Sequence, residues 1–445
     1  MAVQVLRNLS FLLVISLSTM LVILSWGHLL DSISWAAYPG KHRLSDSYLL
    51  DKRGAIALPP ALFINTTQGK SADALTKVQT GRRKTSAQGA EAETPIPVLS
   101  KKSFTKLPQW DFEDVYNQDA PARHTTCATS LRNSEDESFK KAFLPDIRLF
   151  VHKDSINMSE WNRLSHFNNP FGFMNYTYDD VMTSMKLIPK PKEPLLLPLP
   201  DSGGCVRCAV VGNSGILTDS KMGKEIDSHD YVFRMNGAAI KGYEEDVGNK
   251  TSVYVHTSFS ITTSVYLLKD YGYKCVPNDK GIKYVLIPEG MRDFIWLQAL
   301  LKEERITAQT FHGMRPRTYY AGQFNDSRFY VLHQDFLRYV RNRFLKSSNL
   351  NGSHWAIYRP SNGAFTLFLA LQTCDTVDAY GFITEDHEKY PNYYVHRGVK
   401  SKVVFYINHD FLLEMKTWKR LHDSKIIKLY QRTDSDAGTE KPNPH

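Results

Sequence analysis

The stretch CAVVGNSGILTDSKMGKEIDSHDYVFRMN, which runs from Cys208 to Asn236, contains the pattern that decides the fold. Its apolar run Ala209 to Val211 is typical of a short β-strand, and Gly212-Asn213-Ser214-Gly215 then predicts a tight turn. A helical segment and a second apolar run complete half of a nucleotide-binding fold, in which loop N–H groups would face a phosphate. Glycine turns are also common where no ligand binds, so the loop alone does not establish a nucleotide site.

A second segment of similar character lies downstream, where Pro360-Ser361-Asn362-Gly363 precedes AFTLFLALQTCDTVDAYGF. Ser361 is a typical helix N-cap, Ala364 to Thr373 predicts a helix, and Val377 to Phe382 predicts a strand. The first turn of that helix would offer unpaired N–H groups and the positive end of the helix dipole to one phosphate. A buried core helix is the alternative interpretation, and it accounts for most of the segment.

The two segments resemble the large and small sialyl motifs of the eukaryotic sialyltransferases. Tyr393-Tyr394 is similar to the third motif of this family, and His409-Asp410-Phe411-Leu412-Leu413-Glu414 is similar to its very small H-x-x-x-x-E motif. The four motifs stand in the family's order, and the resemblance covers roughly Trp110 to Arg432. It implies an α/β domain of three layers, with a mostly parallel sheet flanked by helices, which is the family's Rossmann-like variant of the glycosyltransferase A fold.

Strands alternate with helices through this region, as a three-layer α/β fold requires. The sequence predicts strands at Ser252 to His256 and Lys283 to Pro288, and helices at Ile295 to Lys302 and Asp335 to Lys346. The proline-rich segment Leu187 to Pro200 is expected to be an extended connector. We interpret the basic residues of the last helix as a solvated face rather than a binding patch. These are Arg338, Arg341, Arg343 and Lys346.

Length and composition agree with one main domain plus appendages. The chain has 445 residues, of which 42% are hydrophobic and 12% aromatic, so it can bury a substantial core. Its net charge of +9 would suit an anionic partner such as a sugar nucleotide or a membrane surface. The basic residues are scattered among 46 acids without a long basic run, which argues against a nucleic-acid partner.

The N-terminal part of the chain predicts a membrane anchor and a linker. Leu9 to Trp26 is uncharged and mostly apolar, so we expect a cytoplasmic tail at 1–8 and a signal-anchor helix at 9–30; a cleaved signal peptide is the alternative. Residues 31–106 are rich in Ser, Thr, Gly, Ala, Lys and Pro, and they predict a stem that cannot bury enough apolar surface to order itself. Residues 107–445 would then be the lumenal catalytic domain.

Six N-x-S/T sites follow the predicted span, which agrees with passage through the secretory pathway. They are Asn65, Asn157, Asn175, Asn249, Asn325 and Asn351. Together with the family resemblance, they imply a single-pass type II protein of the Golgi membrane, with its catalytic domain in the lumen.

The cysteine pattern favours structural disulfides. Cys205-Val-Arg-Cys208 also suggests a zinc site or a redox motif, but no second pair stands at ligand spacing, and a redox C-x-x-C begins a helix rather than a strand. An oxidising lumen permits disulfides instead. The family resemblance implies that Cys208 pairs with Cys374. Of the remaining three, we then expect Cys127 to pair with Cys205 and Cys275 to be unpaired.

The resemblance also implies the chemistry: an acceptor hydroxyl displaces CMP from CMP-sialic acid in one inverting step. Such a step needs a base, and an imidazole with an unperturbed pKa near ~6.5 suits that role. His409 matches the family's catalytic position, although a histidine in a protein is more often a satisfied structural residue. Glu414, five residues further on, would order either the local helix or the base, and the sequence leaves its role open.

The donor contacts follow from the same motifs. Carried over from the family, the residues near CMP are Asn213, Asn236, Ser361, Asn362 and Gly363. Tyr393 stands where some relatives have histidine, so a phenol hydrogen bond would replace a cation near the phosphate. Because CMP has a single phosphate, it can leave without a divalent ion, and we expect no metal and no cofactor besides the donor. We interpret the one Asp-x-Asp, Asp434-Ser435-Asp436, as solvated tail.

The acceptor is the least constrained part of this interpretation. The run YGFITEDHEKYPNYYVHRGVKSKVVFYINHDFLLEMKTWKRLH is most similar to sialyltransferases that form an α2,6 bond to N-acetylgalactosamine (GalNAc) on Ser or Thr of glycoproteins. The choice between the types that accept bare GalNAc or galactosyl-GalNAc stays open. Alternatives are a sialyltransferase acting on galactose, a glycosyltransferase that uses another sugar nucleotide, and an inactive lectin-like Golgi protein.

Overall fold

A computed structural model of the chain describes residues 93–121, 123–399 and 401–432. The predicted tail and membrane span, most of the predicted stem, the sequon at Asn65 and Asp434-Ser435-Asp436 lie outside these residues. Within the described ranges, no helix is both long enough and apolar enough to cross a bilayer.

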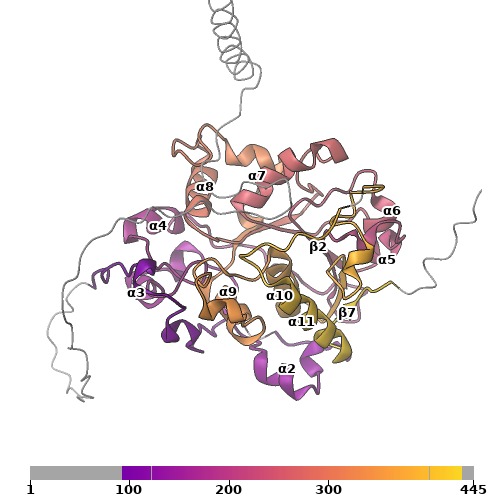
Figure 1. The fold of residues 1–445 in the computed structure, drawn as a ribbon, viewed down its shortest axis with the longest axis horizontal. Helices are drawn as coiled ribbons and strands as arrows, with labels where there is room; N and C mark the ends of the chain where they lie inside the picture. Colours follow the sequence, from indigo (N-terminus) through magenta and orange to yellow (C-terminus); the bar gives the residue numbers. More distant parts are fainter. Residues whose placement is uncertain (1–92, 122, 400, 433–445) are drawn as a thin grey trace, which may run out of the picture. The chain divides into compact units, whose positions relative to one another are not determined.

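The fold is built on one seven-stranded sheet in which every pair of neighbouring strands is parallel (Figure 1). The strand order is β5-β4-β3-β2-β1-β6-β7. In chain order the strands are β1 (Arg207–Val211), β2 (Tyr231–Met235), β3 (Val253–His256), β4 (Lys283–Leu286), β5 (Phe329–Val331), β6 (Thr376–Tyr380) and β7 (Lys428–Leu429). This arrangement confirms the predicted α/β class, because parallel neighbours require crossover connections over the faces of the sheet.

Helices cover both faces of the sheet. They are α2 (Glu137–Ala142), α3 (Met158–Leu164), α4 (Tyr178–Met185), α5 (Gly223–Asp227), α6 (Glu244–Val247), α7 (Ser258–Leu267), α8 (Met291–Lys302), α9 (Gln334–Arg343), α10 (Asn362–Thr373) and α11 (Phe411–Asp423). Core residues of α9, α10 and α11 pack on one face, whereas those of α3, α4, α7 and α8 pack on the other face beside β3, β4 and β5. Helices α5 and α6 cover that second face beside β1 and β2.

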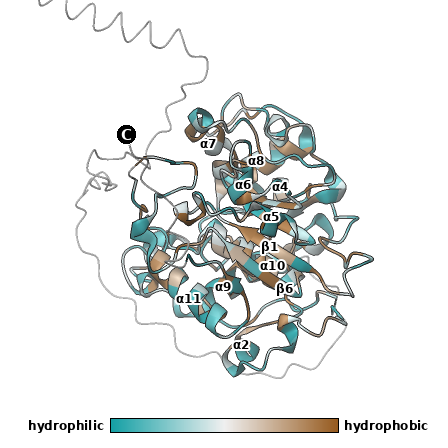
Figure 2. Cartoon of the chain, turned by 90° about the vertical axis from the view of Figure 1, so that its right-hand side faces the viewer, coloured by the Kyte–Doolittle hydropathy of each residue, from teal (hydrophilic) through white to brown (hydrophobic). Residues whose placement is uncertain are grey.

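Side chains of the central strand alternate between the two faces, as the pleat of a strand requires. Cys208 and Val210 of β1 point into the core below α10, and Ala209 and Val211 point into the core below α5. All four side chains are buried. Figure 2 shows the same division: β1 is brown and hydrophobic, whereas the outward surfaces of α5 and α11 are largely teal. The continuous apolar run that the sequence shows here is therefore that of a strand buried on both sides.

The predicted solvated face is wrong for Arg338 and Arg341, because α9 is buried on all sides from Gln334 to Arg341; Arg343 is half-buried and Lys346, just beyond the helix, is exposed. Arg338 and Arg341 have no exposed surface. The Arg341 guanidinium forms an ion pair of 2.6 Å with Asp111 and lies 4.0 Å from the centre of the Phe171 ring. Arg338 donates to the carbonyls of Glu113 and Val115. The segment 111–115, on the N-terminal side of the first strand, covers the helix. It supplies the hydrogen-bond acceptors without which burial of the two guanidiniums would be costly.

The described part of the predicted stem also contacts the folded domain. Leu99 and Phe104 pack against a small cluster that contains Leu107 and Trp355. The Trp355 indole N–H donates to the Phe104 carbonyl at 3.3 Å. Packing against the domain therefore begins at least eight positions before residue 107.

The strand order reverses at β1, and glycines let two loops meet there. β1 lies between β2 and β6, so the connections that follow β1 and β6 leave the sheet at its topological switch point. A Cβ atom on Gly212 would lie 2.4 Å from the Gly381 carbonyl oxygen. The N–H of Gly212 donates to Tyr380 at 2.7 Å, and that of Ser214 donates to Gly381 at 3.0 Å. The expectation that these loop N–H groups face a phosphate is wrong at these two positions, because backbone carbonyls already occupy them.

Candidate active site

Asn213 lies in the loop after β1, at the carboxyl edge of the sheet. Its backbone carbonyl accepts a hydrogen bond of 3.1 Å from the Tyr394 N–H, and Ser214 forms an antiparallel bridge with Tyr393. Its side-chain Oδ1 is buried and has no hydrogen-bond partner within the described ranges. Because an unpaired buried acceptor is costly, this oxygen calls for a donor that the described residues do not supply.

Asn236 connects the large motif to the small one. It follows β2 in the left-handed region, at φ 53°, a conformation that asparagine tolerates better than most residues. Its Oδ1 accepts a hydrogen bond of 2.7 Å from the Asn362 amide, and its carbonyl accepts one of 2.5 Å from the Tyr254 hydroxyl. Two asparagines that stand 126 positions apart in the sequence thus lie side by side.

The first turn of α10 is held by Glu414. Ser361 is the N-cap, and its Oγ accepts a hydrogen bond of 3.1 Å from Ala364. The Glu414 carboxylate accepts one hydrogen bond from the Ser361 N–H and another from the Ser361 hydroxyl, both at 2.7 Å. Burial raises the pKa of Glu414 to about 7. Glu414 therefore orders the small motif and not the imidazole of His409. Gly363 follows in the same turn, where a Cβ atom would lie 3.4 Å from the Ser361 hydroxyl oxygen.

His409 immediately precedes the N-cap of α11, and its tautomer follows from its partners. Nδ1 lies 2.8 Å from the Arg359 carbonyl oxygen, which can only accept, so Nδ1 carries the proton. Nε2 then has the lone pair, with the Asn408 side-chain amide 3.2 Å away. Burial and the Arg359 guanidinium lower the pKa of His409 to about 4. The imidazole is consequently neutral near pH 7, and Nε2 is the atom that can accept a proton.

Tyr393 keeps its proton near neutral pH. Burial, with Tyr406 beside it, raises the pKa of Tyr393 to about 12. Its ring also lies edge-on to that of His396, with 5.3 Å between the ring centres. A neutral phenol at this position can hydrogen-bond to a phosphate but adds no positive charge.

Two disulfides connect the site to the rest of the domain, and they are the two pairs expected from the sequence. Cys208 bonds to Cys374, which joins β1 to the end of α10, and Cys127 bonds to Cys205. Cys275 is a free, exposed thiol. The asparagine side chains of five predicted glycosylation sites are also exposed: Asn157, Asn175, Asn249, Asn325 and Asn351.

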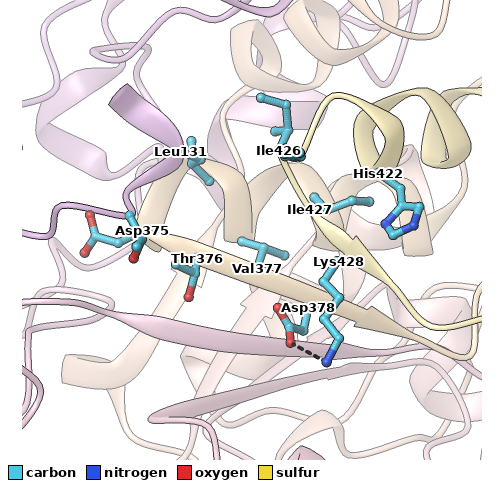
Figure 3. A pocket seen from close by; sticks show the side chains of 11 residues that line it. Leu131, Asp375, Thr376, Val377, Asp378, His422, Ile426, Ile427 and Lys428 are labelled. Carbon is cyan, nitrogen blue, oxygen red and sulfur yellow. Dashed lines mark ion pairs between the residues drawn. The ribbon is translucent and has the colours of Figure 1, made fainter. Parts of the chain in front are cut away.

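Neither of two surface cavities, of about 300 and 320 Å³, includes a predicted site residue. The first lies against the amino half of β6 and against β7, away from the carboxyl edge of the sheet (Figure 3). Two of its lining residues, Asp378 and Lys428, form an ion pair.

One group within the described ranges has the spacing of metal ligands, namely Glu160, His333 and Asp335. The Arg163 guanidinium lies 2.7 Å from both carboxylates of this group. The acids therefore already have a cationic partner, and the cluster is an ion-pair network rather than a cation site.

Three residues near His409 were not predicted from the sequence, namely Asn408, Arg359 and Glu289. Asn408 contacts Nε2 as described above, and its carbonyl accepts a hydrogen bond of 3.0 Å from the Arg359 N–H. The Arg359 side chain forms a two-point ion pair with Glu289, at 2.7 and 2.9 Å. Arg359 directly precedes the small motif, which is a weak signal, whereas Glu289 lies 70 positions away and has no sequence signal at all.

Residues 150–426 match the family model "Glycosyltransferase family 29 (sialyltransferase)". The chain is 48% identical over 342 residues to alpha-N-acetylgalactosaminide alpha-2,6-sialyltransferase 1 of Gallus gallus, a match that covers 75% of this chain and 60% of that protein. It is 47% identical over 341 residues to the Homo sapiens protein of the same name, with 75% and 57% of the two chains covered. The matched region thus spans about three fifths of the length of these relatives.

Among solved structures, one described as "Crystal Structure of a Mammalian Sialyltransferase" resembles the chain with a TM-score of 0.50 and 24% sequence identity. The match covers 70% of this chain and 100% of the other. At this identity, the likeness supports the fold alone.

Proposed function

The chain belongs to glycosyltransferase family 29, the sialyltransferases, and we propose that it transfers sialic acid from CMP-sialic acid to the 6-hydroxyl of GalNAc linked to Ser or Thr of glycoproteins. The names of the relatives at 47–48% identity support this linkage and acceptor. Since those relatives are longer than the matched region, the activity is inferred for the domain that they share with this chain.

One observation carries the proposal: four separate segments are hydrogen-bonded into a single constellation at the carboxyl edge of the sheet. Asn236 contacts Asn362, and Glu414 contacts Ser361. Asn213 contacts the third motif through Tyr394. The segment before the small motif fixes the imidazole of His409. A donor site and a base would be built side by side by these contacts.

The proposed reaction needs one proton acceptor and one leaving-group site. The 6-hydroxyl oxygen of GalNAc attacks the anomeric carbon of sialic acid, and the bond from that carbon to the CMP phosphate oxygen breaks with inversion. The lone pair at Nε2 of His409 takes the hydroxyl proton. Its neutral state near pH 7 suits this task, because a protonated imidazole has no lone pair to offer.

The donor would lie across the loops after β1 and β2. We propose that Asn213 Oδ1 and the Asn236 side chain hydrogen-bond to the nucleotide. The first turn of α10, with Ser361, Asn362 and Gly363, would face the phosphate, since the amino end of a helix favours anions. The Tyr393 hydroxyl would donate one further hydrogen bond.

We propose a subcellular location from features of the sequence. A signal anchor at 9–30 and a stem at 31–106 would hold the catalytic domain in the Golgi lumen. The five exposed sequon asparagines and the two disulfides are compatible with a lumenal compartment.

The experiment that tests the function is incubation of the purified full chain with CMP-sialic acid and a GalNAc-Thr glycopeptide, followed by linkage analysis of the product. The expected product carries sialic acid α2,6-linked to GalNAc. A product formed only on galactose, or turnover only with a UDP- or GDP-sugar, would contradict the proposal. CMP binding without turnover on any acceptor would instead indicate an inactive lectin-like protein.

We also expect the transfer to be independent of divalent metal. A single phosphate develops less charge on departure than a pyrophosphate, so helix and side-chain donors can stabilise it. Transfer rates should be equal with and without EDTA. Activity that disappears with EDTA and returns with manganese would contradict this expectation.

A further inference from the structure

We propose that Glu289 is a positioning residue for the base: through its two-point ion pair with Arg359, it holds the carbonyl that fixes the tautomer of His409. This inference rests on the proposed function and deepens it. It concerns a carboxylate that follows β4, far in sequence from the motifs that carry the donor site and the base.

The backbone of Arg359 forms two hydrogen bonds with the segment Asn408-His409. Its carbonyl accepts from Nδ1 of His409 at 2.8 Å, and its N–H donates to the Asn408 carbonyl at 3.0 Å. The orientation of the imidazole thus depends on where the backbone of this one residue lies. A displacement of Arg359 would change both hydrogen bonds together.

The side chain of Arg359 anchors that backbone. Nε and Nη2 donate to the two oxygens of Glu289 at 2.7 and 2.9 Å, a planar two-point geometry that a lysine cannot reproduce. The side chains are 16% and 6% exposed, so solvent screens the pair weakly. Glu289 is itself held, because its carbonyl accepts from the Asn169 amide at 3.0 Å and Arg292 donates to its carboxylate at 3.1 Å.

Charge gives Glu289 a second effect on the base. The groups whose charges act on this site are Arg359, Arg292, Glu289 and Asp293, with Asp410 next to His409 in the chain. Burial alone would raise the pKa of Glu289, but the Arg359 and Arg292 guanidiniums lower it, so the carboxylate is ionised. Its negative charge offsets Arg359 and favours the imidazolium that forms when His409 takes the acceptor proton.

The test compares Glu289→Gln with wild type in the chain of 445 residues. The kcat is expressed per CMP-binding site, counted by calorimetry, so that unfolded molecules do not enter the rate. We expect kcat per site to fall about 10²-fold, the order of loss that a small misplacement of a reacting group produces, with the affinity for CMP unchanged. Glu289→Asp keeps the charge and should restore part of the rate.

A spectroscopic readout separates positioning from general stability. In protein labelled with ¹⁵N-histidine, the His409 signal, assigned by its loss in His409→Gln, reports which ring nitrogen is protonated. Wild type should show Nδ1 protonation, whereas Glu289→Gln should show a mixture of tautomers. The His409 imidazole should also titrate at lower pH in Glu289→Gln than in wild type, because the variant lacks the negative charge that favours the imidazolium.

Asp335→Asn is the matched control, since it also removes a buried carboxylate from a two-point pair with an arginine, here Arg163. It should lower stability but leave both the His409 tautomer and kcat per site unchanged. Wild-type kcat and tautomer in Glu289→Gln, or an equal loss of kcat per site in Asp335→Asn, would overturn the proposal. A wild type that transfers no sialic acid would refute the proposed function, and the tautomer measurement would still decide this inference.

Discussion

At the scale of single residues, the two ends of the H-x-x-x-x-E motif act on neighbouring positions of another segment. His409 bonds to the carbonyl of Arg359, whereas Glu414 bonds to the N–H and hydroxyl of Ser361. The residue that they bracket is Pro360, which has no N–H of its own and a restricted φ. The two ends of the motif therefore hold the residues on both sides of Pro360.

Replacement of His409 by alanine should abolish transfer and spare CMP binding. Losing a positioned base should lower kcat by about 10²-fold or more, because the acceptor hydroxyl would have no group to take its proton. Turnover would be measured with the GalNAc glycopeptide and CMP affinity by calorimetry. His312→Ala removes an exposed histidine far from the motifs in sequence and should behave as wild type. Near-normal turnover in His409→Ala would show that another group is the base.

Glu414 should make the stability of the fold depend on pH. Burial raises its pKa to about 7 in the folded protein, above its ordinary value of 4.5. The folded state thus binds a proton that the unfolded state has released, so this contribution is complete below about pH 4.5 and is lost as the pH rises to about 7. The expected loss is roughly 3 kcal/mol, since one pKa unit corresponds to about 1.4 kcal/mol.

Urea unfolding of wild type and Glu414→Gln at pH 5 and pH 8 measures that difference. Glutamine cannot ionise, so the variant should lose less stability than wild type between the two pH values. The comparison must be between the proteins, because His409, whose pKa is lowered, contributes a change of the opposite sign. Equal changes in the two proteins would show that Glu414 does not titrate in this range.

At the scale of elements, α9 depends on an N-terminal segment that covers it. Arg341→Ala should therefore lower the free energy of unfolding by about 3–5 kcal/mol, because it leaves the buried Asp111 carboxylate without its partner. Lys346→Ala, at an exposed position just beyond the same helix, should cost no more than about 1 kcal/mol, the range of an exposed cation–π contact with Phe112. Denaturant titration of both variants provides the measurement, and equal losses would argue against the buried pair.

The same helix shows where prediction from sequence stops. Its position is predicted well, with Asp335 to Lys346 expected and Gln334–Arg343 observed. Its environment is not, because the apolar spacing of Phe336, Leu337 and Val340 says nothing about a segment more than 200 positions earlier that supplies acceptors to Arg338 and Arg341. Local periodicity determines the element, whereas non-local partners determine which of its faces meets water.

The candidate site divides in a similar way. The strand before Asn213, the helix cap at Ser361 and the two cysteine pairs follow from local patterns and from the family resemblance. The hydrogen-bond partners of the loop N–H groups could not be predicted in this way, since the Gly212 N–H donates to the carbonyl of Tyr380, a residue 168 positions away. The contact of Glu289 with Arg359 could likewise not be predicted from the sequence, because only the folded sheet brings the end of β4 next to the segment that precedes α10.

At the scale of the whole molecule, the Cys208–Cys374 bond joins the strand that leads to Asn213 with the helix that begins at Ser361. Cys374→Ser should therefore inactivate through the fold. Closing a loop of 166 positions contributes about 5 kcal/mol by chain-entropy reasoning, which is an upper figure. Secretion of soluble protein should fall, with the double variant of both cysteines no worse than either single one.

Cys275→Ser is the control for that experiment, because it removes an exposed free thiol and should leave secretion unchanged. Peptide mapping under non-reducing conditions should recover the linked peptides from active wild-type protein. Free thiols at both Cys208 and Cys374 in active protein would contradict the role given to the bond.

The sequence separation of Cys208 and Cys374 also determines when their disulfide can form during translation. The partner of Cys208 is made 166 residues later, and β6, which completes the pairing of β1, follows directly after it. At about 5–20 residues per second, synthesis of these residues takes roughly 8–33 s, during which Cys208 has no Cys374 to bond to. Cys127, Cys205 and Cys275 are also made before Cys374, so wrong pairing among four cysteines is the hazard of this interval. The central strand of the sheet is thus among the first strands to be translated and among the last to have all its neighbours.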